Sequence, residues 1–464
     1  MVFSSVEFLF WFLPVTLAAH TLAPRRARNA VLLAASLVFY AWGVGGLVLA
    51  FAAGIVLNHR LGLAARPGRR WPLRTAVVVD LGVLLVAKYG QWLVGLAHLP
   101  QLLGNAPVHH RWALPLGLSF FTFQTLSYHL DLDRGLVAAQ RSLVDFGLFV
   151  ALFPHQVAGP ILRYHLIEPA LRDRDVTVEG FAAGVVRFSQ GLVKKVVVAD
   201  AIAPVANAVF ASPPAHVGLV AGWLGVLSFA LQLFFDFSGY SDMAIGLGLM
   251  FGFVIPENFD HPYTSSSMAE FWRRWHISLG AWFRDYVYLP LGGGRSHRVR
   301  NVLVVFVLIG LWHGAAATFL VFGLYHGTLV LLDRAPTPTD GPVARRLVRR
   351  ARTAGLVMVG WVLFRAPSLG RAFGLYRAMV GAGAGLLGHP DDLRKVIDPK
   401  VVVLTALAAT AFLIPSRWME ARVLATGRTS AATAARFALV GVGLPYAALL
   451  VAATNFHPFL YYRF

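Results

Sequence analysis

The chain has 464 residues, of which 57% are hydrophobic and only 14% are charged. This balance excludes an ordinary soluble protein, whose surface carries more charge, and indicates a protein embedded in a membrane. The net charge of +19 is compatible with nucleic-acid binding. However, the arginines lie in short loops between apolar segments, as the positive-inside rule describes, so we expect no nucleic-acid partner. The absence of cysteine excludes disulfides, iron–sulfur clusters and thiol catalysis.

The first apolar run differs from a secretory signal peptide in the order of its charges. No basic residue precedes the run that begins at Val6, whereas Arg25, Arg26 and Arg28 follow it. This order predicts an uncleaved first helix whose N-terminus lies outside the cell.

Further apolar segments recur along the chain, with no long polar block between them. In order they cover residues 5–23, 30–43, 46–59, 75–97, 114–130, 143–160, 184–209, 217–236, 240–255, 302–316, 318–332, 354–366, 401–414 and 437–454. Segment 143–160 contains Pro154 and Gly159–Pro160, which predicts a re-entrant segment packed against protein. We expect an all-α integral membrane protein, a single polytopic domain of residues 1–464. It should have about eleven transmembrane helices plus re-entrant and interfacial helices.

Clusters of basic residues predict which loops are cytoplasmic. Such clusters occur within 60–74, 273–300 and 345–352. The loop 98–113 carries only one arginine, and 367–398 is mixed in charge, so both are expected outside. These sides imply a multi-pass protein of the inner, cytoplasmic membrane.

Ionisable groups inside apolar segments are costly, so each is a candidate for function. They are densest between residues 231 and 327. The first motif there, Gln232–Asp242, contains Asp236 and Asp242 beside serine and glycine, which predicts a broken helix. The two carboxylates could serve catalysis, or they could cap helix ends or pair with arginine; the pattern leaves both open.

The second motif, Glu270–Tyr286, has the spacing of an amphipathic helix at a membrane interface. One face of that helix carries Trp272, Trp275, His276, Leu279, Trp282, Phe283 and Tyr286. His276 would therefore be buried, either in an active site or as a hydrogen-bonded core histidine.

The third motif, Leu308–Ala317, places His313 inside an apolar region. Gly310, Ala316 and Ala317 would be its neighbours on a helix, either for close helix packing or to leave room for a substrate. Histidine accepts a proton near neutral pH, so His313 suits a general base acting on a hydroxyl. A packed histidine bonded to a neighbouring helix fits the pattern equally well.

Other chemistries find less support. His276, His313 and His326 lack the spacing of metal ligands, and we expect no metal site. No Gly-x-Ser-x-Gly motif is present, which disfavours a serine nucleophile. Lys194 and Lys195 could neutralise the phosphates of an acyl donor or extend to the lipid headgroups.

At these residues the sequence resembles the bacterial membrane-bound O-acyltransferases (MBOAT), in particular the branch of the alginate O-acetylation membrane protein. The D-alanyl transfer protein of teichoic-acid modification is a more distant member. Matching motifs extend along nearly the whole chain: Met1–Ser5, Pro115–Gln124, Phe153–Pro160, Phe234–Asp242, Phe271–Ser278, Arg284–Gly293, Gly310–Gly314 and Trp361–Ala366. His155–Gln156 and Ala317 depart from the branch, which expects Gln–Leu and often Trp there, and either could reshape the substrate tunnel.

The resemblance implies a ring of membrane helices around a central tunnel, with an acyl donor entering from the cytoplasm and an acceptor from outside. His313 matches the invariant histidine of the family, and His276 matches the second, supporting one. We expect substrate contacts from polar and aromatic residues of these motifs, namely Asp236, Ser238, Tyr240, Trp275, Arg284, Trp312, Lys194 and Lys195.

Three functions follow as hypotheses. The first is transfer of acetyl from cytoplasmic acetyl-CoA, a substrate and no bound cofactor, to an extracytoplasmic polysaccharide. Transfer would be direct or through an accessory partner such as an SGNH-hydrolase-like protein. The chain itself would be in contact with membrane lipid. The second is transfer of D-alanyl or another acyl group from a carrier protein; the chain length and the stretch Leu291–Arg295 favour the first. The third is a channel or flippase without enzymatic activity.

Overall fold

The computed structural model describes residues 1–65, 68, 70–96, 117–333, 342–386, 388, 393, 399–413, 430–453 and 459–460. The loop 98–113 and parts of 367–398, both expected outside, lie beyond these residues. Over the described ranges the chain forms helices and no β-strand, with two isolated bridges, Val217–Gly388 and Phe259–Trp275. The all-α prediction is confirmed for this part of the chain.

The helices pack into two compact units, one of residues 1–184 and 244–256 and one of residues 185–243 and 257–464. A single polytopic domain, and a ring of helices around a tunnel, both remain predictions.

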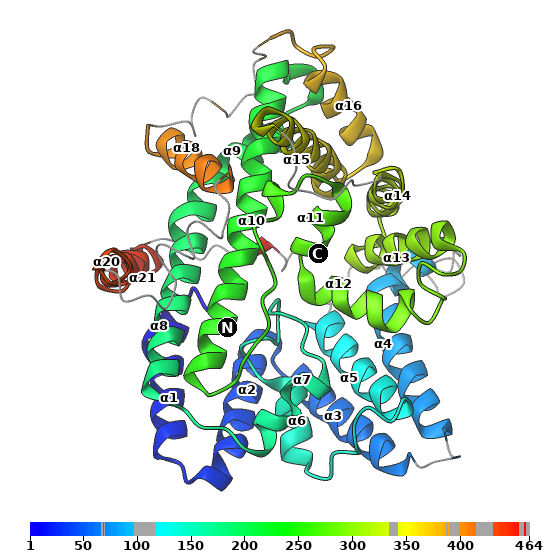
Figure 1. Cartoon of the computed structure of the whole chain (residues 1–464), viewed down its shortest axis with the longest axis vertical. Helices are drawn as coiled ribbons and strands as arrows, with labels where there is room; N and C mark the ends of the chain where they lie inside the picture. Colours follow the sequence, from blue (N-terminus) through cyan, green and yellow to red (C-terminus); the bar gives the residue numbers. More distant parts are fainter. Residues whose placement is uncertain are drawn as a thin grey trace, which may run out of the picture. The chain divides into compact units, whose positions relative to one another are not determined.

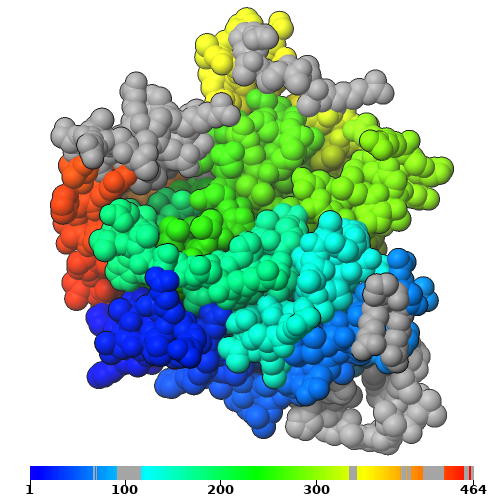
Figure 2. Space-filling model, turned by 60° about the horizontal axis from the view of Figure 1, so that its bottom comes forward, coloured from blue at the N-terminus to red at the C-terminus, as the bar shows by residue number. Residues whose placement is uncertain are grey.

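Unit 1 is built from the first helices of the chain. They are η1 (Phe8–Phe12), α1 (Leu13–Leu22), α2 (Arg28–Val44), α3 (Leu47–Ala64), α4 (Trp71–Leu96), α5 (Leu118–Asp133), α6 (Leu143–Ala151), α7 (Tyr164–Arg172) and the start of α8 (Val178–Val193). Neighbours in the chain pack against one another, and α6 also packs against α2 and α3. In Figure 2 these segments, coloured blue to cyan, form one block.

Unit 2 contains the rest of the chain. Its helices are the end of α8, η4 (Lys194–Ala199), α9 (Asp200–Ala211), α10 (Leu219–Met250, shared with unit 1), α11 (Met268–Arg274), α12 (Ile277–Phe283), η7 (Arg284–Tyr288), α13 (Arg298–His313), α14 (Ala317–Leu332), α15 (Val343–Arg365), α16 (Leu369–Met379), α18 (Pro399–Leu413), α20 (Ser430–Ala438), η9 (Leu439–Gly443) and α21 (Leu444–Ala453). Figure 1 shows α13 and α14 side by side as a helical hairpin, with α15 next along the chain.

Within the described ranges, four helical stretches are long and apolar enough to cross a membrane: Arg25–Val44, Leu47–Ala64, Leu219–Met250 and Thr433–Ala453. Three apolar helices of the described chain are shorter, namely Phe8–Leu22, Ala317–Leu332 and Pro399–Thr410. The structure therefore supports a membrane protein with several apolar helices, while the count of about eleven spans is not confirmed.

The predicted short segment at 143–160 is present as a helix followed by a buried turn. Helix α6 has nine residues, too few to cross a membrane, and the residues from Leu152 to Leu162 are buried in unit 1. Pro154 and Gly159 favour this turn because proline cannot continue a helix. At Gly159, a Cβ atom would lie 2.8 Å from the Pro154 carbonyl oxygen. Whether the segment is re-entrant in a membrane remains a prediction.

The expected break near Asp236 is wrong, because α10 is continuous over 32 residues. Gly239 allows α10 to approach α8 closely: a Cβ atom there would lie 2.7 Å from the Gly191 carbonyl oxygen. Small residues at such a crossing let two backbones approach each other without interrupting either helix. The glycine that suggested a break therefore serves helix packing.

Candidate active site

His276 lies at a break between α11 and α12, where the sequence predicted one continuous helix. Its backbone φ is 47°, in the left-handed region, so the continuous helix is wrong. The backbone of this segment bonds instead to the preceding loop: the Ile277 N–H donates to the Asn258 carbonyl (2.9 Å), and the Asp260 N–H donates to the Arg274 carbonyl (3.0 Å). These bonds to residues 258–260 replace the bonds that a continuous helix would make.

The predicted buried face of this motif is largely confirmed despite the break. The buried residues are Trp275, His276, Leu279, Trp282, Phe283 and Tyr286, whereas Trp272 is partly exposed. Burial lowers the pKa of His276 to about 3, so its imidazole is neutral at physiological pH.

Asn258 orients the His276 ring, and the sequence analysis missed this residue. Its Oδ1 accepts hydrogen bonds from the Ser278 backbone N–H (3.2 Å) and hydroxyl (2.9 Å), and it lies 3.2 Å from His276 Nδ1. Its Nδ2 donates to the Ser241 hydroxyl at 3.2 Å. Because an amide oxygen only accepts, Nδ1 carries the hydrogen and Nε2 is left as an acceptor. Nε2 is buried and has no hydrogen-bond partner among the described residues.

The only sequence signal for Asn258 was its place directly after an apolar segment, which identifies a loop and not a ligand. Its role depends on contacts with Ser241 and Ser278, residues that only the tertiary structure brings to it.

His313 is the last residue of α13, and the following Gly314 is extended (φ 171°). The sequence expected Ala316 and Ala317 as neighbours on the same helix; this is wrong, because α13 ends at His313 and α14 begins at Ala317. A Cβ atom at Gly310 would collide with the Phe319 carbonyl oxygen on α14. Of the two interpretations of the small residues, Gly310 therefore supports close helix packing.

Aromatic rings surround His313, which is 7% exposed. The centroid of its ring lies 4.6 Å from that of Trp312, 4.8 Å from Phe364, 6.0 Å from Phe319 and 6.2 Å from Phe322. An imidazole in such surroundings is shielded from bulk water.

The two histidines both contact Trp312. Its ring centroid lies 6.1 Å from that of His276 and 4.6 Å from that of His313. Phe237 of α10 also packs edge-on against His276, with ring centroids 4.7 Å apart. The three polar motifs that the sequence singled out thus converge in unit 2.

The family model described as the membrane-bound O-acyltransferase family, MBOAT, matches residues 77–339, a range that contains both histidines. The chain belongs to the membrane-bound O-acyltransferase family. It is therefore an O-acyltransferase and a membrane-embedded protein.

Three known proteins of this kind are similar to the chain over different shares of its length. A probable alginate O-acetylase of Azotobacter vinelandii is 45% identical over 88% of this chain and 83% of its own length. A peptidoglycan O-acetyltransferase of Helicobacter pylori is 32% identical, covering 89% of this chain and 87% of the relative. A teichoic acid D-alanyltransferase of Bacillus subtilis is 31% identical over 46% of this chain and 58% of the relative.

The residues expected to bind substrate in this acyltransferase differ in where they lie relative to the two histidines. Trp312 lies within the histidine cluster, and Trp275 packs beside it against Trp361, with ring centroids 5.0 Å apart. Ser238 is buried on α10, and its hydroxyl has no hydrogen-bond partner in the described part of the chain. Arg284 is exposed and pairs with the adjacent Asp285 at 2.8 Å, which separates it from the buried cluster.

Tyr240 and Asp236 contact the end of the chain. The Tyr240 ring centroid lies 4.9 Å from that of Phe459, and the Leu460 N–H donates to Asp236 Oδ2 at 2.8 Å. Both residues of α10 are buried. Their assignment to substrate binding remains a prediction, as it does for the others.

Ion pairs hold the two lysines and the two carboxylates of α10. Lys195 lies 2.8 Å from Asp236 and 2.6 Å from Asp200, and its side chain is only 4% exposed, so it does not extend to lipid headgroups. Lys194 lies 2.6 Å from Asp242. Pairing with arginine, one of the interpretations left open by the sequence, is found for Asp242, whereas the cation beside Asp236 is a lysine.

A second cation, Arg187 of α8, also pairs with Asp242 (2.8 Å) and with Glu257 (2.5 Å). Asp242 therefore has two basic partners, whereas the Lys195 ammonium is shared by two carboxylates. This difference predicts unequal effects of removing either lysine.

Lys195→Met is expected to destabilise the protein by about 3–5 kcal/mol, because it leaves the buried Asp236 carboxylate without its cation. Lys194→Met is the matched control and should cost far less, since Asp242 keeps Arg187. Unfolding of the purified variants in detergent measures both. Equal destabilisation by the two substitutions would contradict the assignment of Lys195 as the buried counter-ion.

Proposed function

We propose that this O-acyltransferase moves an acetyl group from cytoplasmic acetyl-CoA to a hydroxyl of an extracytoplasmic polysaccharide, with His313 as the general base. The observation that carries the proposal is the burial of His313 among aromatic rings, one tryptophan away from the oriented His276. The names of the relatives supply the acceptor class: alginate for one and peptidoglycan for another.

The chemistry requires two proton transfers and the exchange of a carbon–sulfur bond for a carbon–oxygen bond. The acceptor hydroxyl oxygen attacks the thioester carbonyl carbon, its proton passes to a ring nitrogen of His313, and the carbon–sulfur bond breaks. The proton then returns to the departing thiolate, which leaves as coenzyme A thiol. Neutral histidine suits this cycle because it can accept and return a proton near neutral pH.

His276 supports the reaction in a different way. With its Nδ1 hydrogen directed at Asn258, a neutral His276 presents an acceptor nitrogen at Nε2. That nitrogen can accept a hydrogen bond from the hydroxyl of the polysaccharide or from an N–H of acetyl-CoA, but it cannot donate one to the thioester carbonyl. We therefore assign His276 to the orientation of a substrate group that donates a hydrogen bond, and we leave the role of general base to His313.

The D-alanyl alternative is less well supported than acetyl transfer. The teichoic acid D-alanyltransferase matches 46% of this chain, against 88% for the alginate O-acetylase. A channel or flippase conflicts with membership in an acyltransferase family. An SGNH-hydrolase-like accessory protein, contact with membrane lipid and location in the inner membrane belong to the same proposal.

Membrane vesicles of known orientation, inside-out or right-side-out, test the direction of transfer. Acetyl-CoA labelled in the acetyl group cannot cross the bilayer, so label should reach polysaccharide only in vesicles whose cytoplasmic face meets the donor. Transfer of label from donor supplied at the opposite face, at a comparable rate, would contradict the proposal.

Single cysteines in this cysteine-free chain provide the orientation control. An impermeant maleimide on intact cells should label Asn105→Cys, in the loop expected outside, and spare Gly68→Cys, in the basic loop. The reverse pattern would overturn both the topology and the direction of transfer.

A further inference from the structure

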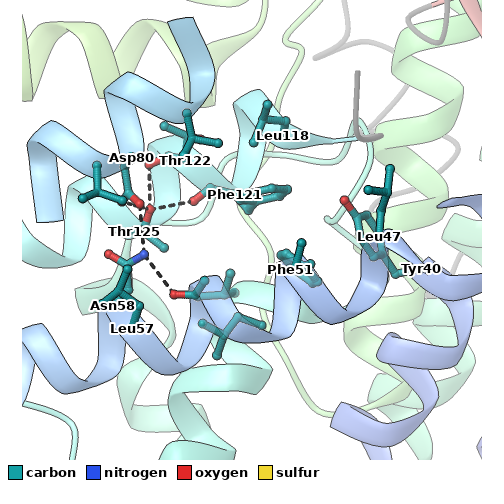
Figure 3. A pocket seen from close by; sticks show the side chains of 16 residues that line it. Tyr40, Leu47, Phe51, Leu57, Asn58, Asp80, Leu118, Phe121, Thr122 and Thr125 are labelled. Atoms are coloured by element: carbon teal, nitrogen blue, oxygen red, sulfur yellow. Dashed lines mark hydrogen bonds between the residues drawn. The ribbon is translucent and has the colours of Figure 1, made fainter. Parts of the chain in front are cut away.

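Unit 1 contains a cavity that the acyl-transfer chemistry does not use. Its volume is about 230 Å³, and it lies among α2, α3, α4, α5 and α6 (Figure 3). Most of its lining is apolar: Leu47, Ala50, Phe51, Ile55, Val79, Leu118, Phe121 and Val150 contribute. An apolar wall of this kind favours a hydrocarbon occupant.

One end of the cavity is a hydrogen-bonded cluster around Asp80 of α4. Thr125 donates its hydroxyl to Asp80 Oδ2 (2.6 Å), and Asn58 donates its amide to Asp80 Oδ1 (2.9 Å). His129 lies behind Asn58, with Nε2 at 2.8 Å from the amide oxygen. Asp80 forms no ion pair with any residue that the structure describes. Each carboxylate oxygen has two lone pairs and keeps capacity for a further donor.

A second polar atom faces the cavity from α2. The Tyr40 side chain is 2% exposed, and its hydroxyl has no hydrogen-bond partner within the described ranges. Figure 3 shows this hydroxyl pointing into the pocket, beyond the ring of Phe51, whose centroid lies 4.5 Å from that of Tyr40. A buried hydroxyl without a partner is costly, which favours an occupant that bonds to it.

The rim of the cavity is apolar and exposed. Leu47, Leu57 and Val83 line it and are 43%, 42% and 52% exposed. Leu47 and Leu57 belong to α3, a helix long and apolar enough to cross a membrane. An occupant would therefore enter from the lipid and not from water.

We propose that this cavity binds an uncharged amphiphile, a medium-chain alcohol or the hydroxyl end of a neutral lipid, whose hydroxyl donates to Asp80. A cavity of about 150 Å³ holds benzene, with six carbons, so 230 Å³ holds roughly nine non-hydrogen atoms. A charged head group, anionic or cationic, is disfavoured because the apolar lining of the cavity cannot replace its hydration. Thr125 and Asn58, which are neutral, donate to Asp80 where an ion pair would have a cation.

The probe is 1-octanol, which has about nine non-hydrogen atoms. The purified protein in detergent should show a saturable rise in unfolding temperature with octanol, as a ligand that binds only the folded state produces. 1-Methoxyheptane has the same size but no donor, and should bind at least tenfold more weakly. Octanoate should not bind, and octylamine should bind more weakly than octanol.

Two glycines give a matched pair of variants. A Cβ atom at either Gly54 or Gly82 would meet nothing within 4 Å, so neither backbone position is closed to a side chain. Only Gly54 lines the cavity, so Gly54→Leu should abolish the octanol effect and Gly82→Leu should preserve it. Asp80→Leu should reduce octanol affinity to that of 1-methoxyheptane.

Any of three results would overturn the proposal: equal binding of octanol and its ether, tightest binding of octylamine, or an unchanged octanol effect in Gly54→Leu. Mass spectrometry of lipids retained by the purified protein then distinguishes the source. A neutral lipid present in the wild type and absent from Gly54→Leu identifies the bilayer; its absence from both identifies a free alcohol.

Discussion

His313→Ala is expected to abolish acetylation of the polymer while the protein remains in the membrane at its normal level. Loss of a general base typically lowers the rate by roughly 10²–10⁴-fold. The shielded surroundings of His313 leave little room for water to take over the proton, because Trp312 and Phe364 lie against its ring. Acetate released from the polymer by mild base, quantified by mass spectrometry, measures the effect.

His20→Ala is the matched control for that experiment. His20 is also a buried histidine, 2% exposed, and its ring packs edge-on against Phe251 in unit 1, outside the cluster around His313. The His20→Ala substitution removes the same side-chain volume as His313→Ala and should leave most of the activity. Retention of more than about a tenth of the wild-type activity by His313→Ala would rule out the base assignment, given the expected loss.

His276→Ala is expected to lower activity by on the order of 10²-fold, as loss of substrate orientation does. Two residues that serve one step give losses that do not multiply. The double variant with His313→Ala should therefore be hardly worse than His313→Ala alone. Steady-state rates of all three variants, measured with the same donor and acceptor, complete the cycle.

Substitutions of Asn258 test whether His276 acts through the orientation of its ring or is only a buried core residue. Asn258→Asp keeps an oxygen that accepts from His276 Nδ1 and from Ser278, whereas Asn258→Leu removes it. We expect Asn258→Asp to retain more activity than Asn258→Leu, with the difference in kcat. If His276→Ala unfolds at a much lower temperature and loses activity only in proportion to unfolded protein, His276 is a core histidine and leaves the site.

Much of the cluster was predictable from residue spacing. The periodicity of residues 270–286 identified the buried face that carries Trp275, His276 and Trp282, and the apolar segments identified a membrane protein. Within α12 the buried positions follow the 3.6-residue repeat, which the sequence states directly, whereas Trp275 and His276 lie at the break before α12 and are buried by tertiary contacts. The motifs around His276 and His313 were also enough to indicate the family, which the comparisons confirmed.

The tertiary structure decided where helices continue and where they break. Gly239 suggested a break and instead lets α10 pass α8, while the motif at His276 suggested continuity and breaks because its backbone bonds to residues 258–260. The tertiary structure also decided the partners of two buried aspartates. Asp236 pairs with Lys195, and Asp80 accepts hydrogen bonds from residues of α3 and α5. In each case the deciding contact, whether a close packing of helices, a hydrogen bond or an ion pair, joins an element to a different one, and local spacing carries no information about that partner.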